Sequence, residues 1–122
     1  LKVNPLHMPH ILSFAEIFVG DSQTMTSEAA VLGIPSFRCN DFVGKLSVME
    51  EKEYKYHLSF NYSPDRFHEM LAQIRNILNN PSAKDEFRKN REKMLSEKID
   101  LSNWLSHLLE NFPVSKSKFK YI

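Results

Sequence analysis

One segment near the amino terminus constrains the fold of this chain more than any other. An apolar run from Ala15 to Val19 precedes Gly20-Asp21-Ser22, and the stretch after that ends at Gly33 and Pro35. The apolar run predicts a buried parallel strand. Asp21 and Ser22 are good helix N-cap residues, Gly33 favours a helix C-terminus, and Pro35 blocks any continuation of the helix. The segment therefore predicts a strand, a tight turn and a helix in direct succession.

The turn before this helix predicts an anion-binding site. Backbone N–H groups at a helix N-terminus have no intrahelical acceptor, and the helix dipole favours negative charge there. The hydroxyls of Ser22 and Thr24 add hydrogen-bond donors. Glu28 lies one helical turn beyond Thr24 on the same face, and a carboxylate is a good acceptor for the two hydroxyls of a ribose. This pattern is typical of a nucleotide held by phosphate at the turn and by ribose at the acid.

The rest of the chain alternates short strands with helices. The pattern predicts further strands over 36–38 and 57–60, and helices over 10–14, 46–54, 63–78, 82–95 and 100–112. Ser82 with Asp85 resembles a capping box at the start of the 82–95 helix. The alternation indicates a right-handed βαβ arrangement. The predicted fold class is α/β: a Rossmann-like open parallel sheet of three or more short strands, flanked by helices, with a helical C-terminal part.

Composition and charge exclude several function classes. Lys and Arg number 16 against 15 Asp and Glu, so no charge bias predicts a nucleic-acid partner. No signal peptide or apolar run of membrane-spanning length is present. The single cysteine, Cys39, excludes an internal disulfide and favours a cytoplasmic location. We expect residues 1–112 to form one domain of a longer protein and residues 113–122 to form a basic tail.

Other chemistry-bearing residues have simpler interpretations. Glu50, Glu51 and Glu53 alternate with Lys52 and Lys55, which is typical of a solvated helix face. The Cys39 thiol is expected to be buried, since no partner for nucleophilic catalysis accompanies it. Three histidines, His7, His10 and His57, lack the spacing and acidic neighbours of a metal site. No metal, no cofactor and no catalytic residue is predicted.

The first segment resembles a known family. Asp21-Ser22, Glu28-Ala29, Leu32-Gly33 and Pro35 are similar, without a gap, to the DSGG-x-x-EEA-x-x-LG-x-P segment of UDP-N-acetylglucosamine 2-epimerases. With Ala15 upstream and Arg38-Cys39-Asn40 downstream, the window resembles more closely still a GT-B-like domain-of-unknown-function family of bacteria and archaea. That family is grouped beside the epimerases. The resemblance covers roughly residues 7–62.

The resemblance implies the C-terminal, nucleotide-sugar-binding half of a GT-B-fold protein. The parent would be a glycosyltransferase or sugar epimerase of surface-polysaccharide synthesis, with a UDP-sugar as its ligand. By this resemblance Ser22, Gln23 and Thr24 contact the diphosphate, and Glu28 accepts hydrogen bonds from the ribose. The catalytic residues would lie in an N-terminal Rossmann-like domain of the same chain.

Three further residues are candidates for contacts to the base or the sugar. They are Met8, His10 and Arg38. His10 could reach a bound nucleotide across the mouth of the sheet, or it could pack at the start of a helix. Arg38 ends a strand where ligands of open α/β sheets lie, but a salt bridge to Asp41 or Glu28 is an equal alternative.

Gln23 and Thr24 stand where the epimerases have two glycines. Glycine allows close approach of the backbone to a pyrophosphate and allows positive φ angles. Either the turn is wider here and side chains supply the donors, or phosphate binding is weakened. The alternative functions are a non-catalytic interaction or regulatory module that keeps the fold, and a binder of another nucleotide.

The last predicted helix carries a wide apolar stripe. Its members are Leu101, Trp104, Leu105, Leu108 and Phe112. In GT-B proteins the final helix commonly crosses back to the N-terminal domain. We therefore expect part of the stripe to pack on the core of this domain and part to be exposed, so that the chain self-associates weakly through this helix.

Overall fold

The sheet is open, parallel and three-stranded, with its strands in the order of the sequence. The computed structural model describes residues 2–42 and 47–114. Within them β1 (Phe18–Gly20), β2 (Ser36–Cys39) and β3 (Ser59–Tyr62) pair in the order β1-β2-β3. Phe18 is level with Ser36, and Ser36 with Ser59. The predicted α/β class, with an open parallel sheet and a helical C-terminal part, is confirmed.

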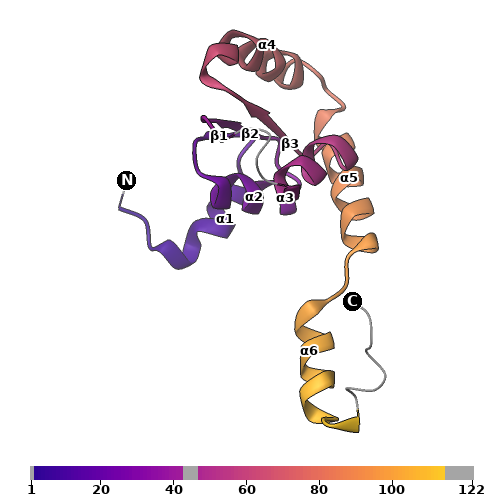
Figure 1. Cartoon of the computed structure of the whole chain (residues 1–122). Helices are drawn as coiled ribbons and strands as arrows, with labels where there is room; N and C mark the ends of the chain where they lie inside the picture. The colour runs from indigo at the N-terminus through magenta and orange to yellow at the C-terminus, as the bar shows by residue number, and fades with distance from the viewer. Residues whose placement is uncertain (1, 43–46, 115–122) are drawn as a thin grey trace.

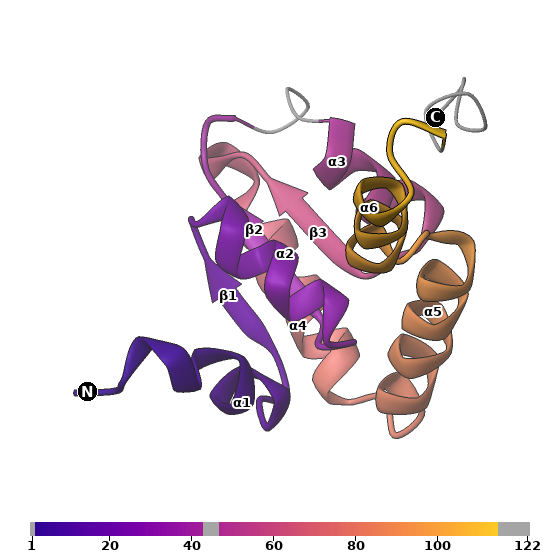
Figure 2. The same cartoon turned by 90° about the horizontal axis from the view of Figure 1, so that it is seen from below.

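Helices cover both faces of this sheet. One face carries η1 (Pro5–His7) with α1 (Met8–Ser13), then α2 (Gln23–Val31), and α3 (Ser47–Glu50) with the π-helical turn η2 (Glu51–Lys55). The other face carries η3 (Pro64–Arg66) and α4 (Phe67–Leu78). Figures 1 and 2 show α1, α2 and α3 on one side of the strands and α4 on the other. Then α5 (Ala83–Glu97) runs beside the sheet and α6 (Leu101–Glu110) extends away from it.

The two faces of the sheet differ in chemistry because successive side chains of a strand point to opposite sides. On the α4 side the Phe37 ring stacks on Phe60, with centroids 5.0 Å apart, and lies 6.4 Å from Tyr62. Phe87 of α5 meets Phe60 edge-on at 6.2 Å. The opposite side chains of β2 and β3 are all polar and buried: Ser36, Arg38, Ser59 and Asn61. The sheet therefore has one aromatic face and one polar face.

Contacts from η2 satisfy part of the polar face. The Glu53 carboxylate accepts hydrogen bonds from the Asn61 backbone N–H at 3.2 Å and from Asn61 Nδ2 at 2.8 Å. Glu53 thus caps the outer edge of β3, where an unpaired N–H could recruit another strand. Lys52, its neighbour, is only 8% exposed. The prediction of a solvated charged face from Glu50 to Lys55 is therefore wrong for Lys52 and Glu53, because both side chains turn towards neighbouring elements.

The structure refines one local prediction and corrects another. The first strand begins at Phe18, within the predicted run from Ala15 to Val19, since pairing with β2 starts where the Phe18 N–H donates to the Pro35 carbonyl at 2.9 Å. The capping box from Ser82 is wrong: the Ser82 side chain makes no capping bond, and Asn80 Oδ1 accepts the Ser82 N–H at 3.0 Å. Asp85 instead forms an ion pair with Arg88.

Polar contacts attach α5 to the body of the domain. Glu97 accepts a hydrogen bond from the Tyr56 hydroxyl at 2.8 Å and pairs with Lys55 at 2.6 Å, and both contacts hold the pKa of Glu97 below its ordinary value. Arg91 Nε donates to the carbonyl of Val31 at the end of α2. Gly33 follows with φ of +80°, and a Cβ there would lie 3.0 Å from Arg91 Cδ. Glycine is therefore required for this helix end and this packing.

The last helix is partly covered by the rest of the described chain. No α6 residue is fully buried, but Trp104 and Leu108 of its apolar stripe are half-buried and each makes an interaction, while Leu101 and Leu105 are exposed. The expectation that part of the stripe packs on the core stays a prediction. Phe112 is 62% exposed, as the other part of the expectation requires. Within residues 2–42 and 47–114, no helix has the length and apolar character needed to span a bilayer. Most of the predicted basic tail, residues 115–122, lies outside the described residues.

Phe37 is the residue on which the aromatic face depends, because it is fully buried and touches both neighbouring rings. We expect Phe37→Ala to lower the free energy of unfolding by about 3–5 kcal/mol, the usual loss for a buried phenylalanine. Urea denaturation followed by circular dichroism measures this. Val19→Ala, at a 48% exposed strand position, should change stability by about 0.5 kcal/mol or less. Equal losses in the two variants would contradict the assignment of the core.

Candidate functional site

The turn between β1 and α2 is held in a fixed shape by its own side chains. Ser22 is the N-cap of α2, and its Oγ accepts the backbone N–H of Met25 at 3.3 Å. Thr26, which is fully buried, donates its hydroxyl to the Ser22 carbonyl at 2.7 Å. Both bonds fix the direction in which the chain enters the helix. The N-terminus of α2 therefore projects from the carboxyl edge of the sheet with defined geometry.

Asn40 fixes this turn to the other two strands. Its Nδ2 donates to the Asp21 carbonyl at 2.9 Å, and its backbone N–H donates to the Tyr62 carbonyl at 3.1 Å. Its Oδ1 accepts the Phe42 N–H at 3.0 Å. One residue, through its side chain and its backbone, thus ties together the carboxyl ends of β1, β2 and β3. No role for Asn40 was predicted, although an asparagine just after a strand is a signal for side-chain-to-backbone bonding.

The first turn of α2 presents free donors to solvent. Gln23 and Thr24 are both exposed. As the first helical residues, they have backbone N–H groups without an intrahelical acceptor. The Ser22 hydroxyl uses its oxygen, not its proton, in the cap, so its proton stays available to donate, as does that of the exposed Thr24. Ser22, Gln23 and Thr24 thus form a helix N-terminus of the kind that binds anions, and their phosphate-binding role stays a prediction.

Glu28 lies one turn along the exposed face of α2. Within the described residues, its carboxylate has no hydrogen-bond or ion-pair partner. It borders a shallow, mostly apolar hollow of about 250 Å³. The other residues lining that hollow are Pro9 of α1 and Ser27, Val31 and Leu32 of α2. The arrangement offers an uncommitted acceptor beside an apolar surface.

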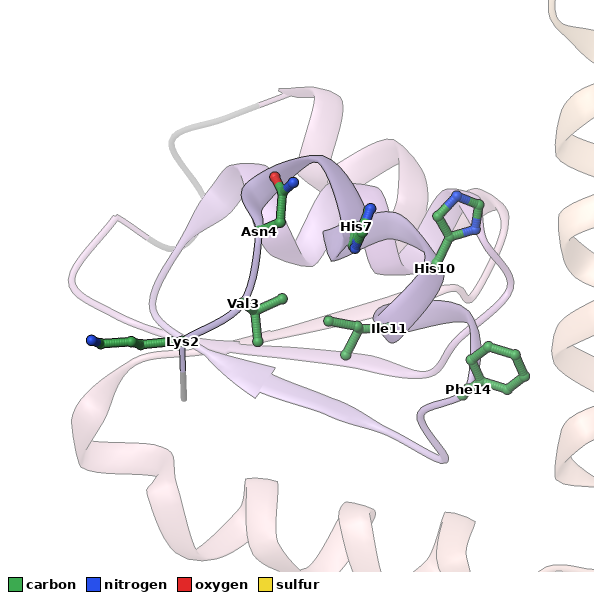
Figure 3. Close-up of a pocket in the computed structure, with 7 residues that line it drawn as sticks. All are labelled: Lys2, Val3, Asn4, His7, His10, Ile11 and Phe14. Carbon is green, nitrogen blue, oxygen red and sulfur yellow. The ribbon is translucent and has the colours of Figure 1, made fainter.

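The three candidates for contacts to the base or the sugar do not belong to the first turn of α2. His10 is exposed on α1 and lines a different hollow, which Figure 3 shows together with His7 and Phe14. Met8 is half-buried at the start of α1. Arg38 is only 1% exposed and lies on the polar face of the sheet, level with Gly20 and Asn61. Among the described residues, none of the three shares a contact or a hollow with the first turn of α2.

Arg38 has an unusual environment. Its Nε and Nη1 atoms are buried and have no hydrogen-bond partner among the described residues. In the described part of the chain, Arg38 forms no salt bridge with Asp41 or with Glu28, so that alternative is wrong, whereas its contact to a ligand stays a prediction. Burial lowers the pKa of Arg38, and the charge of nearby Glu53 opposes that shift. Cys39, the next residue, is half-buried rather than buried.

A second buried cation supports α2 from the side. Lys52 Nζ of η2 donates to Ser27 Oγ at 2.6 Å, and burial lowers the pKa of Lys52. The bond ties η2 to the helix that carries Glu28. Sequence patterning gave no signal for this pair, because the two residues are far apart in the chain. Within the described residues, no group of three or more His, Cys, Asp or Glu side chains could hold a metal ion.

Comparisons with known proteins add no assignment. No protein-family model, no curated protein and no solved structure matches this chain. The family resemblance and the site roles that it implies therefore stay predictions.

The hydroxyl of Ser22 should stabilise the fold through its capping bond to the Met25 N–H, and two substitutions at this position test that bond. We expect Ser22→Ala to lower the free energy of unfolding by about 0.5–2 kcal/mol, because the Met25 N–H loses its acceptor. Ser22→Gly should cost only a few tenths of a kcal/mol, since glycine is itself a tolerated N-cap. Thermal unfolding of the two variants compares them. If alanine and glycine are equally harmless, the capping bond contributes nothing to stability.

Proposed function

We propose that this chain binds a nucleotide sugar, with a UDP-sugar as the ligand. The observation that carries the proposal is the open N-terminus of α2 at the carboxyl edge of a parallel sheet, with Glu28 unpaired one turn along. In open α/β sheets ligands bind outside the carboxyl ends of the strands. The chain would be the C-terminal half of the cleft in a GT-B-type glycosyltransferase or sugar epimerase of surface-polysaccharide synthesis.

The diphosphate would bind at the first turn of α2. The backbone N–H groups of Gln23 and Thr24, which belong to exposed residues at the start of the helix, would donate to the ligand together with the hydroxyls of Ser22 and Thr24. The positive end of the helix dipole adds to the attraction. Donors held in place before the ligand arrives need no reorganisation, so the same groups can stabilise charge that develops on a departing diphosphate. Asn40 supports this by fixing the carbonyl of Asp21.

The ribose would bind at Glu28. Four residues of helix rise about 6 Å, which is the scale of the step from a diphosphate to the ribose diol of the same nucleotide. The carboxylate can accept both ribose hydroxyls because nothing else in the described residues engages it. The apolar surface of Pro9, Val31 and Leu32 is then available to the flat face of the base.

Catalysis would require the other half of the cleft, an N-terminal Rossmann-like domain of the same chain. One observation favours a second candidate, a non-catalytic interaction module: the side chains of Gln23 and Thr24 are exposed where glycines would leave the backbone bare. A module of that kind would keep the fold and bind no nucleotide, so ligand titration separates the two candidates.

UDP added to the protein should bind weakly, with Kd on the order of 0.1–1 mM, since one half of a two-domain cleft supplies only part of the contacts. Changes in amide chemical shifts should cluster at residues 20–28. ADP and GDP serve as competing nucleotides, and inorganic pyrophosphate tests the phosphate contacts alone. No shift with millimolar UDP, or shifts scattered over the surface, would favour the interaction module.

Glu28→Gln should weaken UDP binding while leaving stability nearly unchanged. The amide keeps the shape of the side chain but loses the charge, and hydrogen bonds to charged groups contribute about 1.5–3 kcal/mol. Calorimetric titration measures the affinity, and the melting temperature controls for stability. Glu92→Gln, on the exposed surface of α5, is the matched control. Unchanged affinity with a lower melting temperature would make Glu28 a structural residue.

A further inference from the structure

One apolar side of α6 is exposed to solvent in the described part of the chain. Leu101, Leu105 and Leu109 follow one another at helical spacing and are 61%, 45% and 65% exposed. We call these three residues the leucine stripe. Apolar residues so aligned normally face a protein surface, and a contiguous exposed patch marks an interaction site.

The short length of α6 favours a surface that covers its exposed apolar side. Isolated helices shorter than about 12–15 residues are marginal in water, and most of their stability in proteins comes from packing of an apolar face. The ten residues of α6 are capped by Asp100 through the Asn103 N–H at 3.0 Å, and Trp104 and Leu108 are half-buried. The leucine stripe is exposed, so a surface that covers it would add packing on a second side of the helix.

A second exposed apolar region lies at the other end of the molecule. It is a hollow of about 550 Å³ formed by η1, α1 and the residues before them (Figure 3). Its lining is Lys2, Val3, Asn4, His7, His10, Ile11 and Phe14. Val3 and Ile11 face one another across it, and Phe14, at its end, is 87% exposed. We call this region the N-terminal hollow.

The two regions are opposite in formal charge. The N-terminal hollow carries one cation, Lys2, and no acid, besides two histidines. The helix α6 and its cap carry two acids, Asp100 and Glu110, and neither Lys nor Arg, besides one histidine. Figures 1 and 2 place α1 and α6 on opposite sides of the molecule, so one copy cannot bring them together.

We propose that the leucine stripe of one copy of this chain docks into the N-terminal hollow of a second copy. The contact joins two different surfaces, so each copy keeps one free stripe and one free hollow. Contacts of this kind close into rings or extend into open chains rather than stopping at a two-fold dimer. The surface is separate from the first turn of α2 and does not depend on nucleotide binding.

A mixing experiment tests the proposal. The stripe variant carries Leu105→Asp and Leu109→Asp, and the hollow variant carries Ile11→Asp and Phe14→Asp. All four positions are exposed, so neither variant disturbs the core. Analytical ultracentrifugation should find oligomers beyond the dimer in the parent protein at millimolar concentration, and monomers in either variant alone. In an equimolar mixture the sedimenting species should have twice the mass of the monomer, because each variant supplies the surface that the other has lost.

The control is Tyr54→Asp, which removes a 72% exposed aromatic residue on η2, outside both surfaces. It should associate like the parent, and raising the salt concentration should weaken association of both, since the paired charges are exposed. A monomeric parent protein would overturn the proposal. So would a hollow variant that still associates, which would mean that stripes pair with each other. Variants that are monomeric alone and stay monomeric when mixed would overturn it equally.

Discussion

The pairing of β2 with both of its neighbours is the interaction on which the rest of the structure depends. β2 is the central strand, and its side chains contribute to both layers of the domain. Phe37 holds the aromatic face, while Ser36 and Arg38 belong to the polar face. Because β1 is aligned by this pairing, the turn after Gly20 and the start of α2 are placed at the carboxyl edge. The candidate site is therefore a product of the central strand as much as of its own residues.

The parts of the fold that the sequence predicted are those set by local signals. The segment from β1 to β2 combines a short apolar run, an N-cap serine and a glycine at positive φ, and each acts within a few residues of the chain. These local signals were sufficient to predict that a helix starts just after Ser22. Element ends were less accurate, because pairing between strands, rather than local preference, decides where β1 begins.

The errors fall where distant residues decide the environment of a side chain. Lys52 and Glu53 belong to a segment with the composition of a solvated helix face, but each has a partner on another element: the half-buried Ser27 for Lys52 and the buried Asn61 for Glu53. Arg38 lies inside the polar face with two unpartnered nitrogens, an environment that no spacing rule predicts. The bracing role of Asn40 likewise depends on three strand ends that meet only in the folded chain. Tertiary contacts of this kind leave little trace in a single sequence.

The turn η2 joins the site helix to the edge of the sheet. Two consecutive residues anchor it in opposite directions, Lys52 to Ser27 on α2 and Glu53 to Asn61 on β3. A π-helical turn is wider than an α-helical one; such turns are rare and are frequent at functional sites. The two bonds connect α2 and β3 through a single short segment. The helix that begins at the candidate site is therefore linked to the edge strand by a second route, which does not pass through the centre of the sheet.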